Sequence, residues 1–460
     1  MGQSTSRSMC CAARDKEATL VNAHGPVFGT NIGQFHCTEV EVDIEEPSFL
    51  VFGPLWQKAP GGIGSARRIA LADKTHVRIY RVRDGLCGDE PVNAEGEADR
   101  PQIALEHSLE LPTGNAISSI IFCEEASSRN IGVSYGAGAE LEGKPAGSAF
   151  VRIWNLDMLR SSLSPSQQQQ QNGAVWTLDQ GHIVTLEEKQ GPFTLLTTSA
   201  SYLFGALASG ECICWQKSAG FSKRGAAKLH QGGVDDMNAD RNFLYTTGRG
   251  ECSVGVWTVP SLSSVFNIEV SLPRSIVESF SRVPASGQKG TLPSAGSTES
   301  EKQPEAHLCN VTALRLPLSR WAGSQGAQRA AKAPKGSIYV AAVLAGTSET
   351  SVDGSGVLMH WIMGDRCQCR SAQIAHSSPI VSMVYGPYDN GPLVTADMYG
   401  TCRVWDNVPG LVCSQQIELQ RSSLNASVLF AVEPQVGVYT NAGGNKIAVW
   451  RRDISLPGQG

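Results

Sequence analysis

The chain ends with two similar stretches, GTCRVWDNV at 400–408 and NKIAVWRRD at 445–453. Their tryptophans, Trp405 and Trp450, lie 45 residues apart, and the earlier pair Trp215 and Trp257 lies 42 apart. Apolar and polar residues alternate before each tryptophan, as a strand with one buried face requires. Such a strand, repeated every 40 residues or so, is typical of a β-propeller blade, a small sheet that gains stability by stacking on its neighbours around an axis (about 40–45 residues per blade).

Stretches of this kind occur along the whole chain, and each contains one aromatic residue. The aromatics are Tyr80, Trp154, Trp215, Trp257, Trp361, Trp405 and Trp450. The sequence therefore predicts an all-β fold, a seven-bladed β-propeller of four-stranded blades. The clearest unit has four apolar strand patterns between 379 and 419, separated by turn residues that include Gly400 and Pro409.

The last blade has too little sequence of its own. Only ten residues follow Trp450. The segment CTEVEVDI at 37–44 alternates as a strand does and has no blade ahead of it. We expect this N-terminal strand to complete the last blade, which would also remove an exposed sheet edge.

The domain organisation follows from these patterns. Residues 1–34 are expected to be a flexible acylated tail, and residues 35–460 to form the propeller. Loop insertions are expected at about 84–104, 160–174, 275–306 and 319–336, where large apolar residues are scarce. The simplest interpretation is that they are surface loops without a role, and the alternative is partner docking or phosphorylation.

Composition excludes several classes of protein. A net charge of −5 over 460 residues argues against a general nucleic-acid binder, which would carry a basic footprint. The longest apolar run, Ile338 to Ala345, is far shorter than the roughly 20 residues that span a bilayer. The 13 cysteines are scattered, which indicates a reducing, cytoplasmic location rather than a disulfide scaffold.

Three histidines, His230, His307 and His376, precede apolar strands, and Trp405 is followed by Asp406. At these residues the chain resembles the WD-repeat (WD40) β-propeller family. The resemblance implies a histidine and an aspartate that hydrogen-bond within each blade, and a scaffold for proteins rather than an enzyme. Where the family has the aspartate, this chain has Ser209, Tyr399 and Gly444.

The first six residues, MGQSTS, match the pattern for N-myristoylation at Gly2. One myristoyl chain gives only marginal attachment, with a partition constant of about 10⁴ M⁻¹. Cys10 and Cys11 follow closely, and palmitate on either would make the attachment durable. The sequence therefore predicts a protein that lies on the cytoplasmic face of a membrane, either the plasma membrane or an endomembrane.

Motifs for catalysis and cofactor binding were sought without success. The chain has no phosphate-binding G-x-x-x-x-G-K-[ST] loop, no G-x-S-x-G elbow and no H-E-x-x-H pair. The pairs Cys212/Cys214 and Cys367/Cys369 lack the usual zinc spacing, so we expect no metal and no cofactor. Arg67-Arg68 departs from the F-R-R-G motif of phosphoinositide-binding propellers, and that function is not carried over.

These observations favour a non-catalytic scaffold that binds one or more proteins and is tethered to a membrane by myristate and palmitate. Nucleic acids and small-molecule substrates are not expected partners. Two alternatives stay open: a soluble WD-repeat subunit of a nuclear or RNA-processing complex, which would use the basic loop at 319–336, and a propeller enzyme with a site in the central channel.

Overall fold

The structure is a computed structural model. It describes residues 35–44, 47–52, 66–83, 102–111, 116–123, 129–136, 148–161, 174–177, 182–188, 191–272, 307–316, 336–345, 354–364, 367–385, 393–406, 411–418, 430–432 and 437–452. The described part is almost entirely β-strand, with one short α-helix, α1 (Leu156–Ser161), and one 3₁₀ turn, η1 (Lys217–Ala219).

Six sheets of the described part have four strands each. One contains β6 (Ala116–Phe122), β7 (Asn130–Gly136), β8 (Ala149–Asn155) and β10 (His182–Glu188). The next contains β11 (Phe193–Thr198), β12 (Tyr202–Leu207), β13 (Glu211–Gln216) and β14 (Ser222–Lys228). It is followed by β15 (Val234–Ala239), β16 (Phe243–Gly248), β17 (Ser253–Thr258) and β18 (Ser264–Glu269).

The other three four-stranded sheets lie toward the C-terminus. They are formed by β19 (His307–Arg315), β20 (Gly336–Ala345), β21 (Ser355–Met363) and β22 (Gln368–His376); by β23 (Ile380–Tyr385), β24 (Leu393–Asp397), β25 (Thr401–Asp406) and β26 (Val412–Glu418); and by β27 (Phe430–Val432), β28 (Gly437–Gly443), β29 (Lys446–Arg452) and β1 (Phe35–Glu41).

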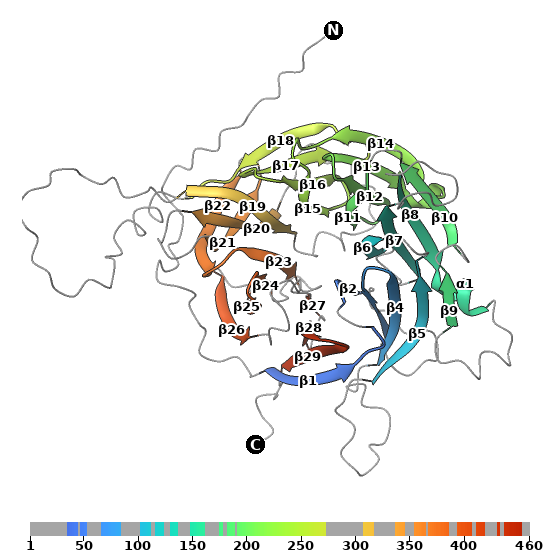
Figure 1. Cartoon of the computed structure of the whole chain (residues 1–460). Coiled ribbons are helices and arrows are strands. Elements are labelled where there is room, and N and C mark those ends of the chain that lie inside the picture. Colours follow the sequence, from blue (N-terminus) through green and yellow to red (C-terminus); the bar gives the residue numbers. More distant parts are fainter. Residues whose placement is uncertain are drawn as a thin grey trace, which may run out of the picture.

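The remaining sheet of the described part has five strands. They are β2 (Phe49–Phe52), β3 (Ala66–Ala72), β4 (His76–Arg83), β5 (Gln102–Glu110) and β9 (Ala174–Thr177). The first four pair antiparallel, and β9 adds to the outer edge of β5 in the parallel direction. The sheets stand around a common centre, with blue β1 beside red β29 (Figure 1).

The ring is closed at its centre by the first strand of each sheet. Around the axis, β2 contacts β6, and contacts then follow through β11, β15, β19, β23 and β27 back to β2. The fold is therefore a β-propeller, and the first strands line its axis.

The prediction of seven four-stranded blades is wrong. The described residues form six blades of four strands each, and the sheet that begins with β2 has a fifth strand, β9. The physical reason is the unpaired outer edge of β5, which offers free backbone N–H and C=O groups and accepts a segment from the connection between β8 and β10. The sequence showed only a polar run before Ala174, so this connection was expected to be a plain loop.

The N-terminal strand completes the last blade, and this expectation is confirmed. β1 pairs antiparallel with β29 over seven residues, from Phe35 opposite Arg452 to Glu41 opposite Lys446. The pairing continues with a hydrogen bond from the Val42 N–H to the Asn445 carbonyl at 2.8 Å. Residues more than 400 positions apart in the chain thus lie in one sheet, and this contact fastens the ring.

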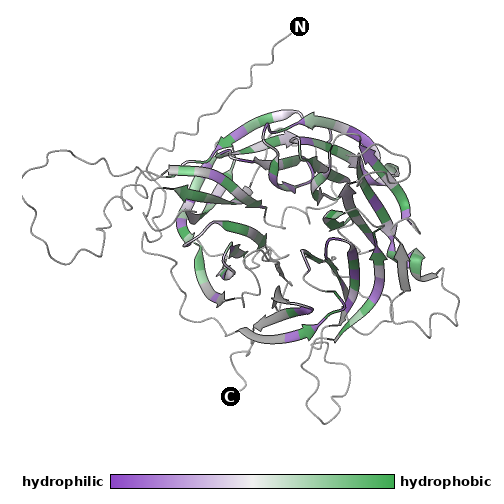
Figure 2. Cartoon of the chain, in the orientation of Figure 1, coloured by the Kyte–Doolittle hydropathy of each residue, from purple (hydrophilic) through white to green (hydrophobic). Residues whose placement is uncertain are grey.

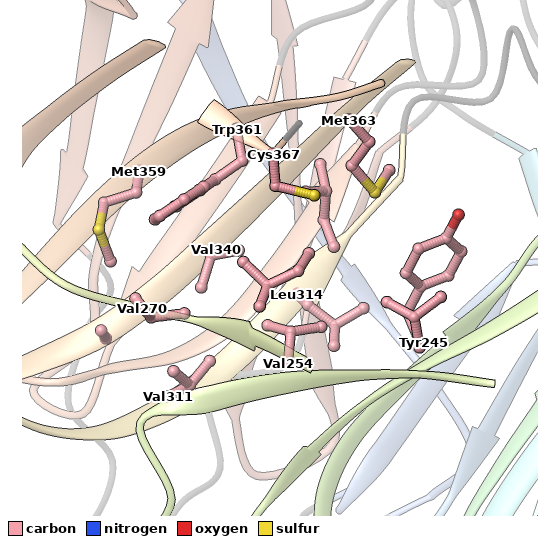
Figure 3. Close-up of a cluster of buried hydrophobic side chains, with 14 of the residues drawn as sticks. Tyr245, Val254, Val270, Val311, Leu314, Val340, Met359, Trp361, Met363 and Cys367 are labelled. Atoms are coloured by element: carbon pink, nitrogen blue, oxygen red, sulfur yellow. The ribbon is translucent and has the colours of Figure 1, made fainter. Parts of the chain in front are cut away.

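Apolar side chains fill the spaces between neighbouring sheets. Figure 2 shows hydrophobic residues alternating with polar ones along the strands, as half-buried strands require. Figure 3 shows one such core, a single buried cluster that contains Tyr245 and Val254 of one blade and Val340, Met359 and Trp361 of the next. Each fully buried large apolar side chain contributes about 1.5–3 kcal/mol, so the contacts between blades carry much of the stability.

All of the predicted blade aromatics lie on the third strand of a sheet, namely β4, β8, β13, β17, β21, β25 and β29. Tyr80, Trp154, Trp215, Trp361 and Trp405 are buried, whereas Trp257 is partly exposed. Within the described part, no helix has the length and apolar character needed to cross a bilayer.

Two prolines in β1 test the closure. Replacing both Glu39 and Val40 with proline removes whichever of the two N–H groups faces β29 and disrupts the strand. We expect the free energy of unfolding in urea to fall by several kcal/mol, because Val42 and Ile44 also pack in the core beneath β1 (at about 1.5–3 kcal/mol each). The same substitutions at Ala18 and Thr19 are the control, and equal stability of the two variants would contradict this role.

Candidate interaction surface

One blade contains a continuous hydrogen-bond chain from its third strand to its surface. In the sheet of β15–β18, the Trp257 Nε1–H donates to Thr246 Oγ1 at 2.8 Å, and Thr246 Oγ1 lies 2.7 Å from His230 Nε2. His230 Nδ1 lies 2.8 Å from Glu251 Oε2. Since a carboxylate only accepts, Nδ1 carries the proton, and the Thr246 hydroxyl then donates to Nε2. The chain fixes the histidine, and with it the loop that leads into β15.

A second blade repeats the arrangement with an aspartate. In the sheet of β23–β26, the Trp405 Nε1–H donates to Thr395 Oγ1 at 2.8 Å, and Thr395 Oγ1 lies 2.7 Å from His376 Nε2. His376 Nδ1 faces Asp397 Oδ2 at 3.4 Å. Both blades thus have the histidine, acid and tryptophan that the WD-repeat resemblance implies.

The acid was sought at the wrong position in the sequence. Tyr399 occupies the position expected from the sequence, but the structure gives the role to Asp397, two residues earlier, and to Glu251 in the other blade. Ser209 and Gly444 lie in turns of other blades, where Ser209 Oγ accepts a hydrogen bond from the Glu211 N–H at 3.4 Å. The side chain of His307 lies outside the described residues.

Asp397 also shapes the turn that follows it. Its Oδ1 accepts hydrogen bonds from the backbone N–H groups of Tyr399 at 3.0 Å and Thr401 at 2.8 Å. Burial would raise the pKa of Asp397, but hydrogen bonds from His376, the Thr401 N–H and Ser378, with the charge of His376, hold this pKa below its ordinary value. The carboxylate therefore stays ionised and keeps the turn in one conformation.

In one blade the threonine is absent, and the tryptophan N–H then lacks this acceptor. In the sheet of β19–β22, Trp361 pairs with Ile338 as Trp405 pairs with Leu393, so Val340 stands where the other blade has Thr395. The buried Trp361 Nε1–H has no hydrogen-bond partner among the described residues. The turn between the second and third strands of this blade lies outside the described residues.

We call the surface that carries His230 and His376 the histidine face. It holds the connections into each first strand and the turns between second and third strands, which bond to one another. The Leu229 N–H donates to Gly210 O at 2.9 Å, the Arg249 N–H to Gly233 O at 3.2 Å and the Met398 N–H to Pro379 O at 3.1 Å. Each of these bonds ties a turn between second and third strands to a neighbouring connection.

Large apolar side chains are exposed on the histidine face. Val381, Met398 and Tyr399 are 49%, 40% and 38% exposed, although Val381 begins an inner strand and the others form the turn held by Asp397. Single exposed apolar residues are ordinary on protein surfaces. These three lie on two segments that are hydrogen-bonded to each other, so the backbone that carries them would lose little entropy if the surface were covered.

Charged groups line the centre of the ring below this face. Asp236 on β15 accepts a hydrogen bond from the Leu314 N–H at 2.9 Å and pairs with Arg315 on β19 at 2.5 Å. Asp235 pairs with Arg249, which is 67% exposed, at 3.3 Å. The Asp236–Arg315 pair joins the first strands of adjacent blades, whereas the Asp235–Arg249 pair links β15 to the β16–β17 turn of its own blade.

The cysteine pairs noted in the sequence have surroundings that favour a structural role. Burial raises the pKa of the Cys214 and Cys369 thiols to about 12 and raises that of Cys212 as well, so these cysteines are protonated and behave as small apolar groups. Within the described residues, no group of three metal-ligating side chains comes together. Gly2, Cys10 and Cys11 lie outside the described residues, as does the basic loop 319–336 except for Gly336.

Arg68 was part of the rejected phosphoinositide motif, and its surroundings explain its presence. Its side chain is 2% exposed and pairs with Glu106 at 2.6 Å and with Asp157 at 3.1 Å. Glu106 also pairs with Arg81 at 2.9 Å. The network joins two neighbouring sheets through α1, and Arg68 is not available to a headgroup. The sequence did not indicate this ion-pair network, because Arg68 and Asp157 are 89 residues apart.

Comparison with known proteins gives no family and only distant likenesses. No family profile matches the chain, and no curated protein matches it. A chain of the mitotic checkpoint complex is similar over 88% of this chain and 94% of its own length, with 12% identity and a TM-score of 0.48. The computationally designed Ika8 protein is similar over 89% of this chain and 98% of its own, with 11% identity and a TM-score of 0.46.

Replacing Thr395 with valine tests the network. The change keeps the shape but leaves the Trp405 Nε1–H and His376 Nε2 without their shared partner. We expect the free energy of unfolding to fall by about 1–3 kcal/mol, the cost of unpaired buried polar groups. Thr185→Val, on the exposed part of β10, is the control and should change stability by less than about 0.5 kcal/mol. A loss no larger than that of the control would show that the network contributes nothing.

The Glu106 carboxylate predicts a pH dependence. Burial would raise its pKa, but the hydrogen bond and charge of Arg68, with the charge of Arg81, lower the pKa from 4.5 to about 2. A lowered carboxyl pKa stabilises the fold above pH 4.5, and this contribution is lost as the pH falls from 4.5 toward 2.

Glu106→Gln should therefore be less stable at neutral pH, by about 3 kcal/mol, since it leaves buried Arg68 with one fewer partner. Its stability should also change less than that of the unaltered protein between pH 5 and 3, measured by urea unfolding across this range. Glu39→Gln, which removes an exposed pair with Lys446, is the control. Parallel pH profiles for Glu106→Gln and the unaltered protein would contradict the assignment.

Proposed function

We propose that this protein is a non-catalytic scaffold that binds one or more proteins on the histidine face. The observation that carries the proposal is the turn of Met398 and Tyr399, which is held by the Asp397 carboxylate yet exposes two apolar side chains. A folded catalytic site would need converging reactive groups. The described histidines of this face, His230 and His376, are instead engaged with threonine and acid side chains.

We further propose that the scaffold works at the cytoplasmic face of a membrane, plasma membrane or endomembrane. The support is the sequence alone: Gly2 in a myristoylation pattern and Cys10-Cys11 close behind it. A tether raises the effective concentration of the ring toward partners at the same surface, to the millimolar range or so for a short flexible linker. Weak docking on a small apolar surface then becomes productive without further contacts.

Gly2→Ala tests the tether. The substitution removes the only acceptor of myristate, and without myristate the nearby cysteines are not brought to the membrane for palmitoylation. We expect the membrane fraction of cell lysates to lose most of the protein, and intact-mass analysis of the N-terminal peptide to lose the mass of the acyl group. Ser4→Ala, which keeps the pattern, is the control.

A variant with Cys10→Ser and Cys11→Ser separates the two lipids. It should keep myristate but bind membranes only reversibly, because one acyl chain anchors weakly. If Gly2→Ala and the unaltered protein are found equally in the membrane fraction, the membrane part of the proposal is wrong. Unmodified Gly2 in the mature protein would favour the soluble alternative.

A further inference from the structure

The outer edge of β5 is only half covered. β5 has nine residues, and β9 pairs with four of them, from His107 opposite Ala174 to Glu110 opposite Thr177. Over Gln102–Glu106 the only strand that pairs with β5 in the described part is β4, on its other side. Among the described residues, these five therefore have no strand on their outer edge.

The strand that covers the other half is a weak occupant. β9 is four residues long, pairs with β5 alone and runs parallel, the direction that gives the less stable ladder. Short edge strands gain little from packing, and what holds β9 in place is chiefly its attachment to the same chain. A longer strand that pairs with all of β5 would form more hydrogen bonds than β9 does.

The uncovered half of β5 is suited to an apolar strand. Ile103 and Leu105 pack partly against the core beneath β3 and β4, and they remain half-exposed. The Glu106 carboxylate between them and β9 is already held by Arg68 and Arg81. Residues 167–172, which precede β9 in the sequence, are all polar, whereas this half of the edge favours apolar side chains.

The outer strand β14 carries positive charges that β5 lacks. β14 carries exposed Arg224 and Lys228 and the half-exposed Lys223, and lysines on an edge strand discourage further pairing. Residues 102–106 of β5 include no lysine and no arginine.

We propose that the edge of β5 is a docking site for an extended segment of a partner protein, which adds to the sheet parallel to β5 in place of β9. The segment has about nine residues with apolar side chains at alternate positions, beside Ile103 and Leu105. β9 acts as an internal competitor that the partner displaces. This inference adds a partner class and a second binding surface to the proposed scaffold. Its biological role rests on the proposed function, but the binding of a peptide to β5 can be tested without it.

A direct binding experiment uses a fluorescent peptide, Thr-Val-Thr-Val-Thr-Ala-Val-Trp-Thr, whose last four residues repeat β9. Three full-length chains are compared by fluorescence anisotropy: the unaltered protein, a variant with Val175→Pro and Trp176→Pro, and a control with Gln167→Pro and Gln168→Pro in the same connection. Proline removes the N–H groups that β9 needs for the ladder. We expect the β9 variant to bind the peptide about tenfold more tightly, because its edge is no longer occupied. The control should bind as the unaltered protein does.

A second variant tests the proposal even if the proline variant misfolds. Ser108 and Val175 are register partners, and neighbouring strands lie about 4.8 Å apart, within the range of a disulfide. With Ser108→Cys and Val175→Cys, oxidation should lock β9 in place and abolish peptide binding, and reduction should restore it, while the oxidised unaltered protein still binds.

Equal affinity of the three chains, or binding that survives the disulfide, would overturn the proposal. The same holds if the peptide binds none of the chains. The readout does not depend on Gly2, so failure here and failure of the membrane proposal are separate results.

Discussion

Pairing of β1 with β29 is the contact on which the rest of the structure depends. Each sheet has apolar residues on both faces and is stable only when a neighbour covers each face. A row of such sheets would leave two faces open at its ends, and closure into a ring leaves none. The chain achieves this with a strand from its beginning and a strand from its end, and the Tyr80 hydroxyl, which accepts a hydrogen bond from the Asp43 N–H at 2.8 Å, continues the join into the next sheet.

The ring in turn makes the histidine face a rigid platform. The hydrogen-bond chains from Trp257 and Trp405 run from the core to the loops that lead into β15 and β23, so packing inside each blade fixes the backbone at its surface. A side chain on such a backbone, like that of Met398, can be exposed without being mobile in its main chain. Preorganisation of this kind lowers the entropic cost of covering the surface with a partner.

Much of the fold could be predicted from the sequence because the signals are local. Alternation before Trp405 and the spacing to Trp450 depend on a few neighbouring residues, and the unpaired pattern at 37–44 indicated the closing strand. What was missed depends on residues far apart. β9 was hidden behind a polar run, and its pairing with β5 joins residues 67 positions apart. The roles of Asp397 and Arg68 were missed for the same reason, since each is defined by partners on other strands and not by a motif.

Hydrogen–deuterium exchange of the full-length protein, followed peptide by peptide, tests the closure most directly. If β1 fastens the ring, the amides of β1 and β29 become exposed only in the same cooperative opening that exposes the inner strands β15 and β19. Exchange of the β1 amides at the rate of unprotected chain, while β28 and the other sheets stay protected, would contradict the account.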